Sequence, residues 1–224
     1  MQYKVLFMEE KNQQPTETLK DIRQIMERSS RFISLSGLSG LAAGVCALVG
    51  AWVVTQVDKN FMNITEETVR SGEAGQSVMN TIAVTWIGII VFISAFALSF
   101  FFTWQRSKTT GVPVWGSTAR RLLLNIAIPM LAGGILIFRL IQLDLITLIA
   151  PACLIFYGLA LINGSKYTIG EVRYLGYCQI ILGLCNLWVL GYGLYFWAAG
   201  FGVLHILYGA IMWFKYEKNK KPKG

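Results

Sequence analysis

The sequence is poor in charged residues. Of its 224 residues only 14% are Asp, Glu, Lys or Arg, whereas 54% are hydrophobic and the mean hydropathy is +0.53. Soluble domains carry roughly 25% charged residues, so this chain has too few to cover a surface in water. The uncharged stretches are 32–57, 74–105, 122–138, 145–165 and 174–214. Stretches of about 18 or more apolar residues are typical of membrane spans, which excludes a soluble enzyme.

Histidine and cysteine are scarce as well. His205 is the only histidine, and one histidine without further ligands at its depth cannot form a metal site. The four cysteines, Cys46, Cys153, Cys178 and Cys185, all fall within uncharged stretches. There they are expected to pack as small apolar residues rather than to form disulfides. We therefore expect no metal ion and no other cofactor.

The apolar stretches predict an all-α polytopic membrane protein, a bundle of six transmembrane helices. The last stretch, 174–214, would make a helix of about 60 Å, twice the ~30 Å hydrocarbon core, so it has to turn back. Gly191-Tyr192-Gly193 offers a flexible turn. The N-terminal tail covers 1–31, the membrane domain 32–214 and the basic tail 215–224. The predicted spans are 32–57, 78–104, 122–143, 145–163, 174–190 and 192–214.

The basic residues predict the orientation of the bundle. With the N-terminus inside, the cytoplasmic segments hold 17 of the 20 lysines and arginines, and the outer segments hold only Lys59, Arg70 and Arg139. The positive-inside rule therefore places both termini in the cytoplasm. The lysine-rich C-terminal tail is expected to face anionic lipid headgroups of the bilayer, not nucleic acid.

The N-terminal tail contains one predicted amphipathic helix. Thr18 and Asp21 resemble a capping box, and an apolar stripe at spacings of three and four follows. One interpretation is an interfacial helix that lies on the cytoplasmic leaflet. The other is a docking helix for a cytoplasmic protein partner or for the second protomer of a homodimer. The stripe consists of Leu19, Ile22, Ile25, Met26 and Phe32.

Small residues line one face of the first span. Ser36, Gly40 and Gly44 follow one another at intervals of four residues. Such stripes let two helix backbones approach closely in a membrane. We expect this face to pack against another helix; a face that lines a substrate path is the alternative.

A few polar residues within the spans are candidate functional residues, because polar groups in the membrane are costly. Arg139 and Asp144 flank the turn between spans three and four and are close enough in sequence to pair. His205 is expected to bond to a neighbouring helix or to its own. The remaining candidates, which could join helices or line a path, are Asn125, Gln179 and Asn186.

One pattern resembles a catalytic site. Gly37-Leu38-Ser39-Gly40 together with His205 and Gly209 is similar to the serine–histidine dyad of rhomboid intramembrane proteases, which also have six spans. In rhomboids, however, the serine motif lies in a late span and a large first external loop is present. Catalysis by Ser39 and His205 is therefore the most remote hypothesis.

Two stretches carry a further resemblance. Residues 25–40, IMERSSRFISLSGLSG, and 191–209, GYGLYFWAAGFGVLHILYG, resemble a family of multi-pass inner-membrane proteins of the Bacteroidetes. The resemblance covers most of the chain and implies a bacterial inner membrane. It implies no activity, so no site residue is carried over.

Three classes of function follow. The first is a non-catalytic membrane protein with a sensor, scaffold or assembly role. The second is a small transporter or channel for a neutral solute, since the spans contain almost no buried charge that could couple ions. The third is the intramembrane hydrolase.

Overall fold

The computed structural model describes residues 36–57, 78–110 and 115–215, and all of the long elements in these ranges are helices. The amphipathic helix expected within 1–31 and the tail 216–224 lie outside the described residues. The all-α prediction is therefore confirmed for the part of the chain that the structure describes. The helices are α2 (Gly37–Val57), α4 (Val78–Thr110), α5 (Ser117–Gln142), α6 (Ile149–Gly164), α7 (Val172–Trp188), α8 (Gly193–Trp197) and α9 (His205–Trp213).

Among the described residues, five helical stretches are long and apolar enough to cross a membrane. They cover 37–57, 83–109, 117–142, 146–167 and 193–213. α7 is shorter, with 17 residues, which corresponds to about 26 Å of helix. Two 3₁₀ turns flank α6, at Ile146–Leu148 and Ser165–Tyr167.

Two helices extend further than the uncharged stretches predicted. α4 ends at Thr110 instead of residue 104, and α5 begins at Ser117 instead of 122. A helix satisfies its own backbone hydrogen bonds, so it can continue through polar residues beyond the apolar layer. Basic side chains there lie over aromatic rings: Lys108 Nζ is 3.6 Å from the centre of the Trp104 ring. The connection between α4 and α5 therefore comprises only residues 111–116 instead of 105–121.

The last apolar stretch folds back at the predicted turn. α7 ends at Trp188 and α8 begins at Gly193. Between them Gly191 has φ 96°, a left-handed conformation that favours glycine. The following span is not a uniform α-helix, because a π-helix, η5 (Ala198–Leu204), joins α8 to α9. We refer to the continuous segment Gly193–Trp213 as span six.

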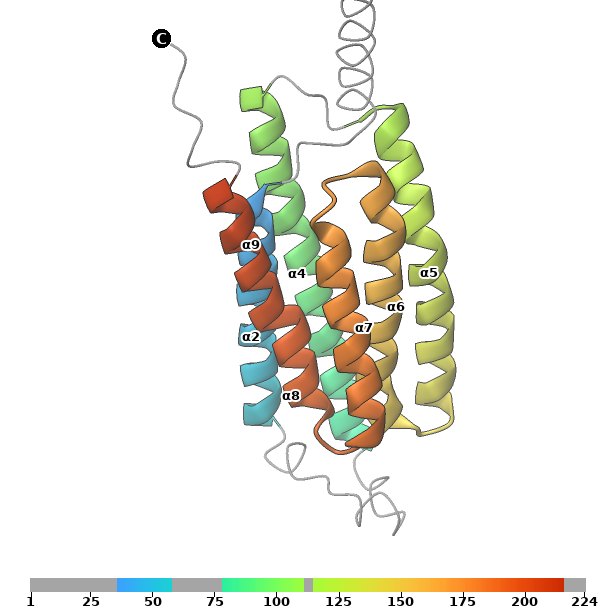
Figure 1. Cartoon of the computed structure of the whole chain (residues 1–224). Helices are drawn as coiled ribbons and strands as arrows, with labels where there is room; N and C mark the ends of the chain where they lie inside the picture. The colour runs from blue at the N-terminus through green and yellow to red at the C-terminus, as the bar shows by residue number, and fades with distance from the viewer. Residues whose placement is uncertain (1–35, 58–77, 111–114, 216–224) are drawn as a thin grey trace, which may run out of the picture.

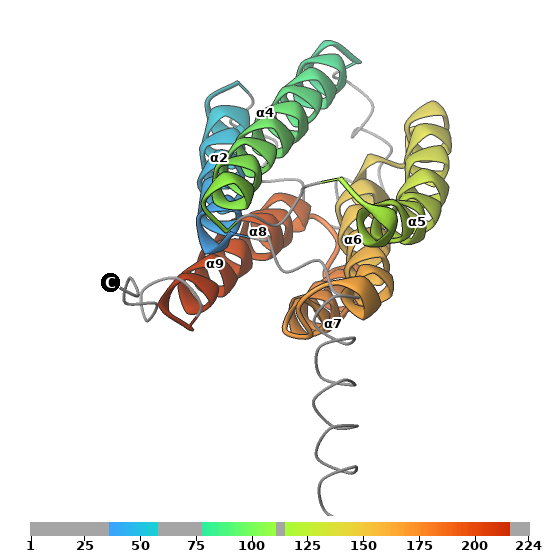
Figure 2. The ribbon, with the colours of Figure 1, turned by 90° about the horizontal axis from the view of Figure 1, so that it is seen from above.

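The helices form two subbundles that meet along span six (Figures 1 and 2). The first subbundle consists of α2, α4 and α9, with α2 packed against both others. The second consists of α5, α6, α7 and α8, with α6 packed against the other three. Seen from above, α4 and α5 lie on different sides of the molecule (Figure 2).

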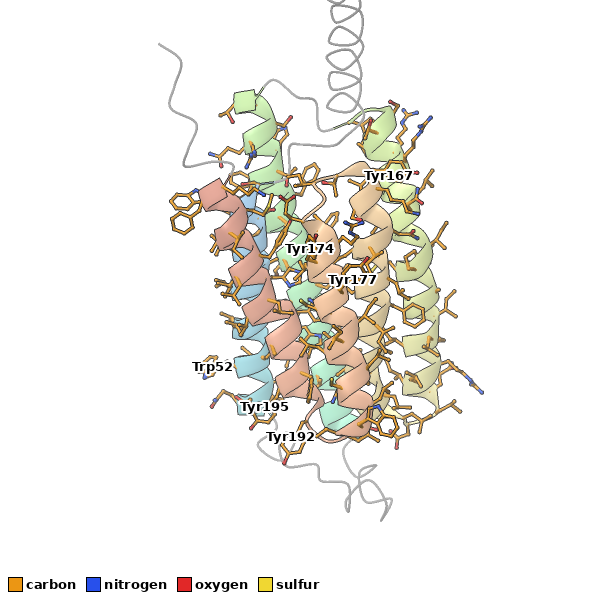
Figure 3. The ribbon with its side chains drawn as sticks, viewed as in Figure 1. Trp52, Tyr167, Tyr174, Tyr177, Tyr192 and Tyr195 are labelled. Atoms are coloured by element: carbon orange, nitrogen blue, oxygen red, sulfur yellow. The ribbon has the colours of Figure 1, made fainter. Side chains whose placement is uncertain are left out.

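Successive long helices run in opposite directions, so α2 begins and α9 ends at the same end of the bundle (Figure 1). The structure describes eight basic residues, and seven of them gather at this end, where Glu171 is bonded to Lys215 at 2.5 Å. Arg139, on the last turn of α5, lies at the opposite end (Figure 1). Trp52, Tyr192 and Tyr195 lie toward the opposite end, whereas Tyr167 and Tyr174 lie nearer the basic end (Figure 3). Aromatic side chains at both ends are typical of membrane interfaces. The seven basic residues at the end where α2 begins are Arg106, Lys108, Arg120, Arg121, Lys166, Arg173 and Lys215.

Candidate functional site

His205 lies at the junction of the two subbundles, with both ring nitrogens bonded within the protein. Its Nε2 is 2.8 Å from the hydroxyl of Tyr157 on α6, and its Nδ1 is 3.0 Å from the carbonyl oxygen of Gly200. Because a carbonyl can only accept, Nδ1 carries the hydrogen. In the neutral ring Nε2 then accepts a hydrogen bond from Tyr157. The ring is therefore fixed by one neighbouring helix and by its own backbone.

The carbonyl of Gly200 is shared by two side chains. Besides His205, Gln179 on α7 donates from Nε2 to the same oxygen at 2.8 Å. Gln179 is fully buried. In an α-helix the backbone bond to this oxygen would come from Leu204, four residues on, whereas in a π-helix it comes from the fifth residue. Two side chains from different elements thus bond to one carbonyl inside the π-helix.

Amides on α7 face glycines on span six at two levels. A Cβ on Gly200 would lie 2.5 Å from Gln179 Oε1, and a Cβ on Gly193 would lie 3.8 Å from Asn186 Oδ1. Gln179 and Asn186 are seven residues apart on α7, and Gly193 and Gly200 are seven residues apart on span six. This interval keeps one face of a helix toward a neighbouring helix. Asn186 also donates from Nδ2 to the carbonyl of Val189 at 3.1 Å. Each amide thus packs where the facing helix has no side chain.

The same two amides each keep one oxygen without a hydrogen-bond partner among the described residues. These atoms are Gln179 Oε1 and Asn186 Oδ1, and both side chains are 0% exposed. Buried polar atoms are usually paired. The α7–span six interface is therefore the part of the described bundle with buried acceptor capacity to spare.

Aromatic rings surround His205. Trp197, Phe201 and His205 are spaced by four residues on span six, with centroid distances of 5.2 and 6.0 Å between successive rings. Tyr157 lies against two of them, 5.0 Å from the Phe201 centroid and 5.4 Å from that of His205. The imidazole is thus held by ring contacts as well as by hydrogen bonds.

Ser39 and His205 are bonded to different groups. The hydroxyl of Ser39 donates to the carbonyl of Ser36 at 2.6 Å, within the first turn of its own segment. The Ser39 carbonyl accepts from Ser99 on α4 at 3.1 Å. A nucleophile–base pair needs a hydrogen bond between the two side chains, and the structure gives both partners of the His205 ring as other groups.

The small-residue stripe of α2 lies against span six. A Cβ on Gly40 would be 3.1 Å from Gly209 Cα and 3.3 Å from the carbonyl oxygen of His205. A Cβ on Gly44 would be 2.7 Å from the carbonyl oxygen of Gly202. Ser36, at the start of this face, is buried. The two backbones approach so closely that side chains larger than hydrogen do not fit between them.

Arg139 and Asp144 do not pair as their spacing suggested. Arg139 donates from Nη1 to Gln142 Oε1 at 3.1 Å, both on the last turns of α5. Asp144 follows the helix end with φ 58°. Gln142 is three residues after Arg139 and therefore lies on the same face of α5. Asp144 follows the end of α5 and its backbone is left-handed, so it does not continue that face.

Asn125 lies near the basic end of α5. Its Nδ2 donates to the Arg121 carbonyl at 2.8 Å, and its own carbonyl accepts from Asn163 of α6 at 3.5 Å. It therefore contributes to the α5–α6 contact and lies away from the cluster around His205.

Tyr157 is the residue of this cluster that the sequence analysis missed. It lies within Leu154-Ile155-Phe156-Tyr157-Gly158, an apolar run in which one hydroxyl is hard to notice. The available signal was that a tyrosine near the middle of a span needs a partner for its hydroxyl. His205 was the polar residue in need of a partner.

No candidate metal site is present in the described part of the chain. No three His, Cys, Asp or Glu side chains gather there where a metal ion could bind. Comparisons of the chain with protein-family models, with curated proteins and with solved structures found no significant match.

Proposed function

We propose that this chain is a six-span protein of a bacterial inner membrane with both termini in the cytoplasm. Five long apolar helices and the shorter α7 support the number of spans. The collection of basic side chains at the end where α2 begins and α9 ends supports the orientation (Figure 1).

Within that membrane the protein has a non-catalytic assembly role, in which α4 binds α4 of a second copy of the chain. The observation that carries this proposal is the isolation of α4. It packs mainly on α2, and Ser107 is its only buried side chain among those described. The exposed fractions are 60% for Phe92, 65% for Phe96 and 54% for Phe100.

These three phenylalanines are four residues apart and form a ridge along α4. Ridges of this spacing can pack into the grooves of a facing helix. Because each copy presents the same ridge, two copies can associate symmetrically through it. Aromatic anchors carry much of the binding energy at protein interfaces.

Co-purification of two differently tagged copies from one membrane tests the assembly role. The double variant Phe96→Ala/Phe100→Ala should lower recovery of the second copy about tenfold. Leu131→Ala/Ile135→Ala is the matched control, because these α5 side chains are 66% and 71% exposed. Absence of co-purification by the unmodified chain, or an equal loss in both double variants, would contradict the proposal.

A neutral-solute pathway is the second candidate function, and the unpaired oxygens of Gln179 and Asn186 are the observation that favours it. Such oxygens could accept hydrogen bonds from a hydroxyl or amide solute. Flux of small neutral polyols and amides into proteoliposomes tests it. Flux above that of empty liposomes that is lost in Gln179→Leu/Asn186→Leu supports a pathway, and flux equal to empty liposomes rejects it.

A further inference from the structure

Span six changes its neighbours midway along its length. Its first part, α8, packs on α6 and α7, and its last part, α9, packs on α2. The π-helix η5 lies between these parts and contacts both α2 and α7. Figure 2 shows span six running between the two subbundles. The subbundles are joined by the chain between α4 and α5, and by span six, whose passage from one subbundle to the other lies at the π-helix.

The π-helix η5 is an irregular segment of the helix backbone. π-turns are rare, are usually limited to one turn and occur often at functional sites. η5 has seven residues, including Gly200 and Gly202. Both glycines are in close contact with a facing side chain, Gly200 with Gln179 and Gly202 with Leu48. Glycine also leaves the backbone freer to change conformation than other residues do.

Two side-chain hydrogen bonds join the second subbundle to the π-helix and to the start of α9. Gln179 of the second subbundle bonds to the Gly200 carbonyl, and Tyr157 of the second subbundle bonds to His205, the first residue of α9. His205 in turn bonds back to Gly200. We call Tyr157, Gln179, Gly200 and His205 the latch. Its members tie the π-helix and α9 to α6 and α7.

We propose that η5 is a hinge on which the first subbundle moves against the second, and that the latch holds the position seen here. Side-chain hydrogen bonds within membranes are individually modest, so the latch can open without unfolding of either subbundle. An α-helical register in place of the π-turn would shift the Gly200 carbonyl about the helix axis, away from Gln179 Nε2, and would rotate α8 relative to α9. This motion changes the separation of α4 and α5, which belong to different subbundles.

Distances between spin labels in the full chain, reconstituted in nanodiscs, test the hinge. The four cysteines are first replaced by serine or alanine, and labels are then attached to Ile90→Cys on α4 and Leu131→Cys on α5. These positions are 60% and 66% exposed. The control pairs lie within one subbundle: Ile90→Cys with Val49→Cys, and Leu131→Cys with Ile181→Cys.

In the latch variant Tyr157→Phe/Gln179→Leu, the mean distance between the two labels on different subbundles should shift by about 5 Å, roughly one helical turn, or the distribution of that distance should widen by as much. Both control pairs should keep their distances. Gln142→Leu, which removes an exposed amide on α5, is the matched control variant. The hinge would be overturned if the distance distribution between the subbundles is as narrow as those of the control pairs and does not change in the latch variant.

Hydrogen exchange of the unmodified chain keeps the proposal testable if the latch variant fails to fold. Amides of Ala198–Leu204 should exchange at least about tenfold faster than those in the middle of α7, because local opening precedes exchange. Equal protection of the two segments would contradict a hinge. The spin-labelled chain is diluted with an excess of unlabelled, cysteine-free chain, so that distances between copies do not contribute and the two proposals can fail separately.

Discussion

The carbonyl oxygen of Gly200 accepts a hydrogen bond from Gln179 Nε2 at 2.8 Å, although the two residues belong to adjacent helices and are 21 positions apart. A side chain reaches this carbonyl because the facing residue is glycine and the backbone there is a π-helix. The bond sits where span six passes from one subbundle to the other. It relates a local departure from α-helical geometry to the arrangement of the whole bundle.

Gly40→Leu should destabilise the contact between α2 and span six. A Cβ at Gly40 would already lie 3.1 Å from Gly209 Cα, so a leucine has to push two backbones apart. We expect a loss of at least about 1–3 kcal/mol, the usual cost of overpacking. Thermal unfolding in detergent measures it. Gly134→Leu is the control, because nothing lies within 4 Å of a Cβ at that position; equal melting of both variants would contradict the close contact.

Tyr157→Phe should destabilise the bundle modestly. The variant keeps the aromatic ring beside Phe201 and removes only the hydroxyl that bonds to His205 Nε2. Hydrogen bonds between membrane helices average about 0.6 kcal/mol, and we expect a loss of that order. Equilibrium unfolding in mixed micelles measures the free energy of unfolding of this variant and of the control Tyr177→Phe. Tyr177 is 45% exposed. A stability at or above that of the control would argue against a bonded His205.

Ser39 should not react with a fluorophosphonate, a probe that labels activated serines. Its hydroxyl donates to the Ser36 carbonyl at 2.6 Å, and the base that would activate it is bonded to Tyr157 and Gly200. Mass spectrometry of the chain labelled in native membranes checks this. Labelling of Ser39 that disappears in His205→Ala would restore the hydrolase hypothesis.

Gly191→Ala should weaken the turn between α7 and α8. Gly191 has φ 96°, and a side chain in left-handed backbone costs about 1–2 kcal/mol. Gly170→Ala is a suitable comparison, since Gly170 has no positive φ and no atom within 4 Å of an added Cβ. Unfolding of both variants in the same detergent should show the loss only for Gly191→Ala.

The distribution of charge was sufficient to predict helices, because a membrane span has to be apolar along its whole length. It did not predict where helices end, since α4 continues past Arg106 and Lys108 to Thr110. It also could not say which helices are neighbours. The small residues Gly40 and Gly44 indicate that another helix approaches closely, but they do not indicate which helix. The structure shows that this helix is span six.

The candidate site was less predictable than the fold. His205, Gln179 and Asn186 stand out in apolar sequence because buried polar groups are costly. Tyr157 and the Gly200 carbonyl do not stand out, and they supply the hydrogen bonds to His205. The π-helix leaves no periodic pattern in the sequence, because it changes backbone hydrogen bonds rather than the residue types that face the core.

Reporter fusions at Ser71 and after Gly224 test the central claim, a six-span bundle with both ends in the cytoplasm, most directly. Alkaline phosphatase is active only outside the cytoplasm, and green fluorescent protein folds to its fluorescent form only inside it. The phosphatase should therefore be active at Ser71 and inactive at the C-terminus, and the fluorescent protein should give the opposite result. An active phosphatase after Gly224 would mean an odd number of spans or a reversed bundle, and would contradict the account.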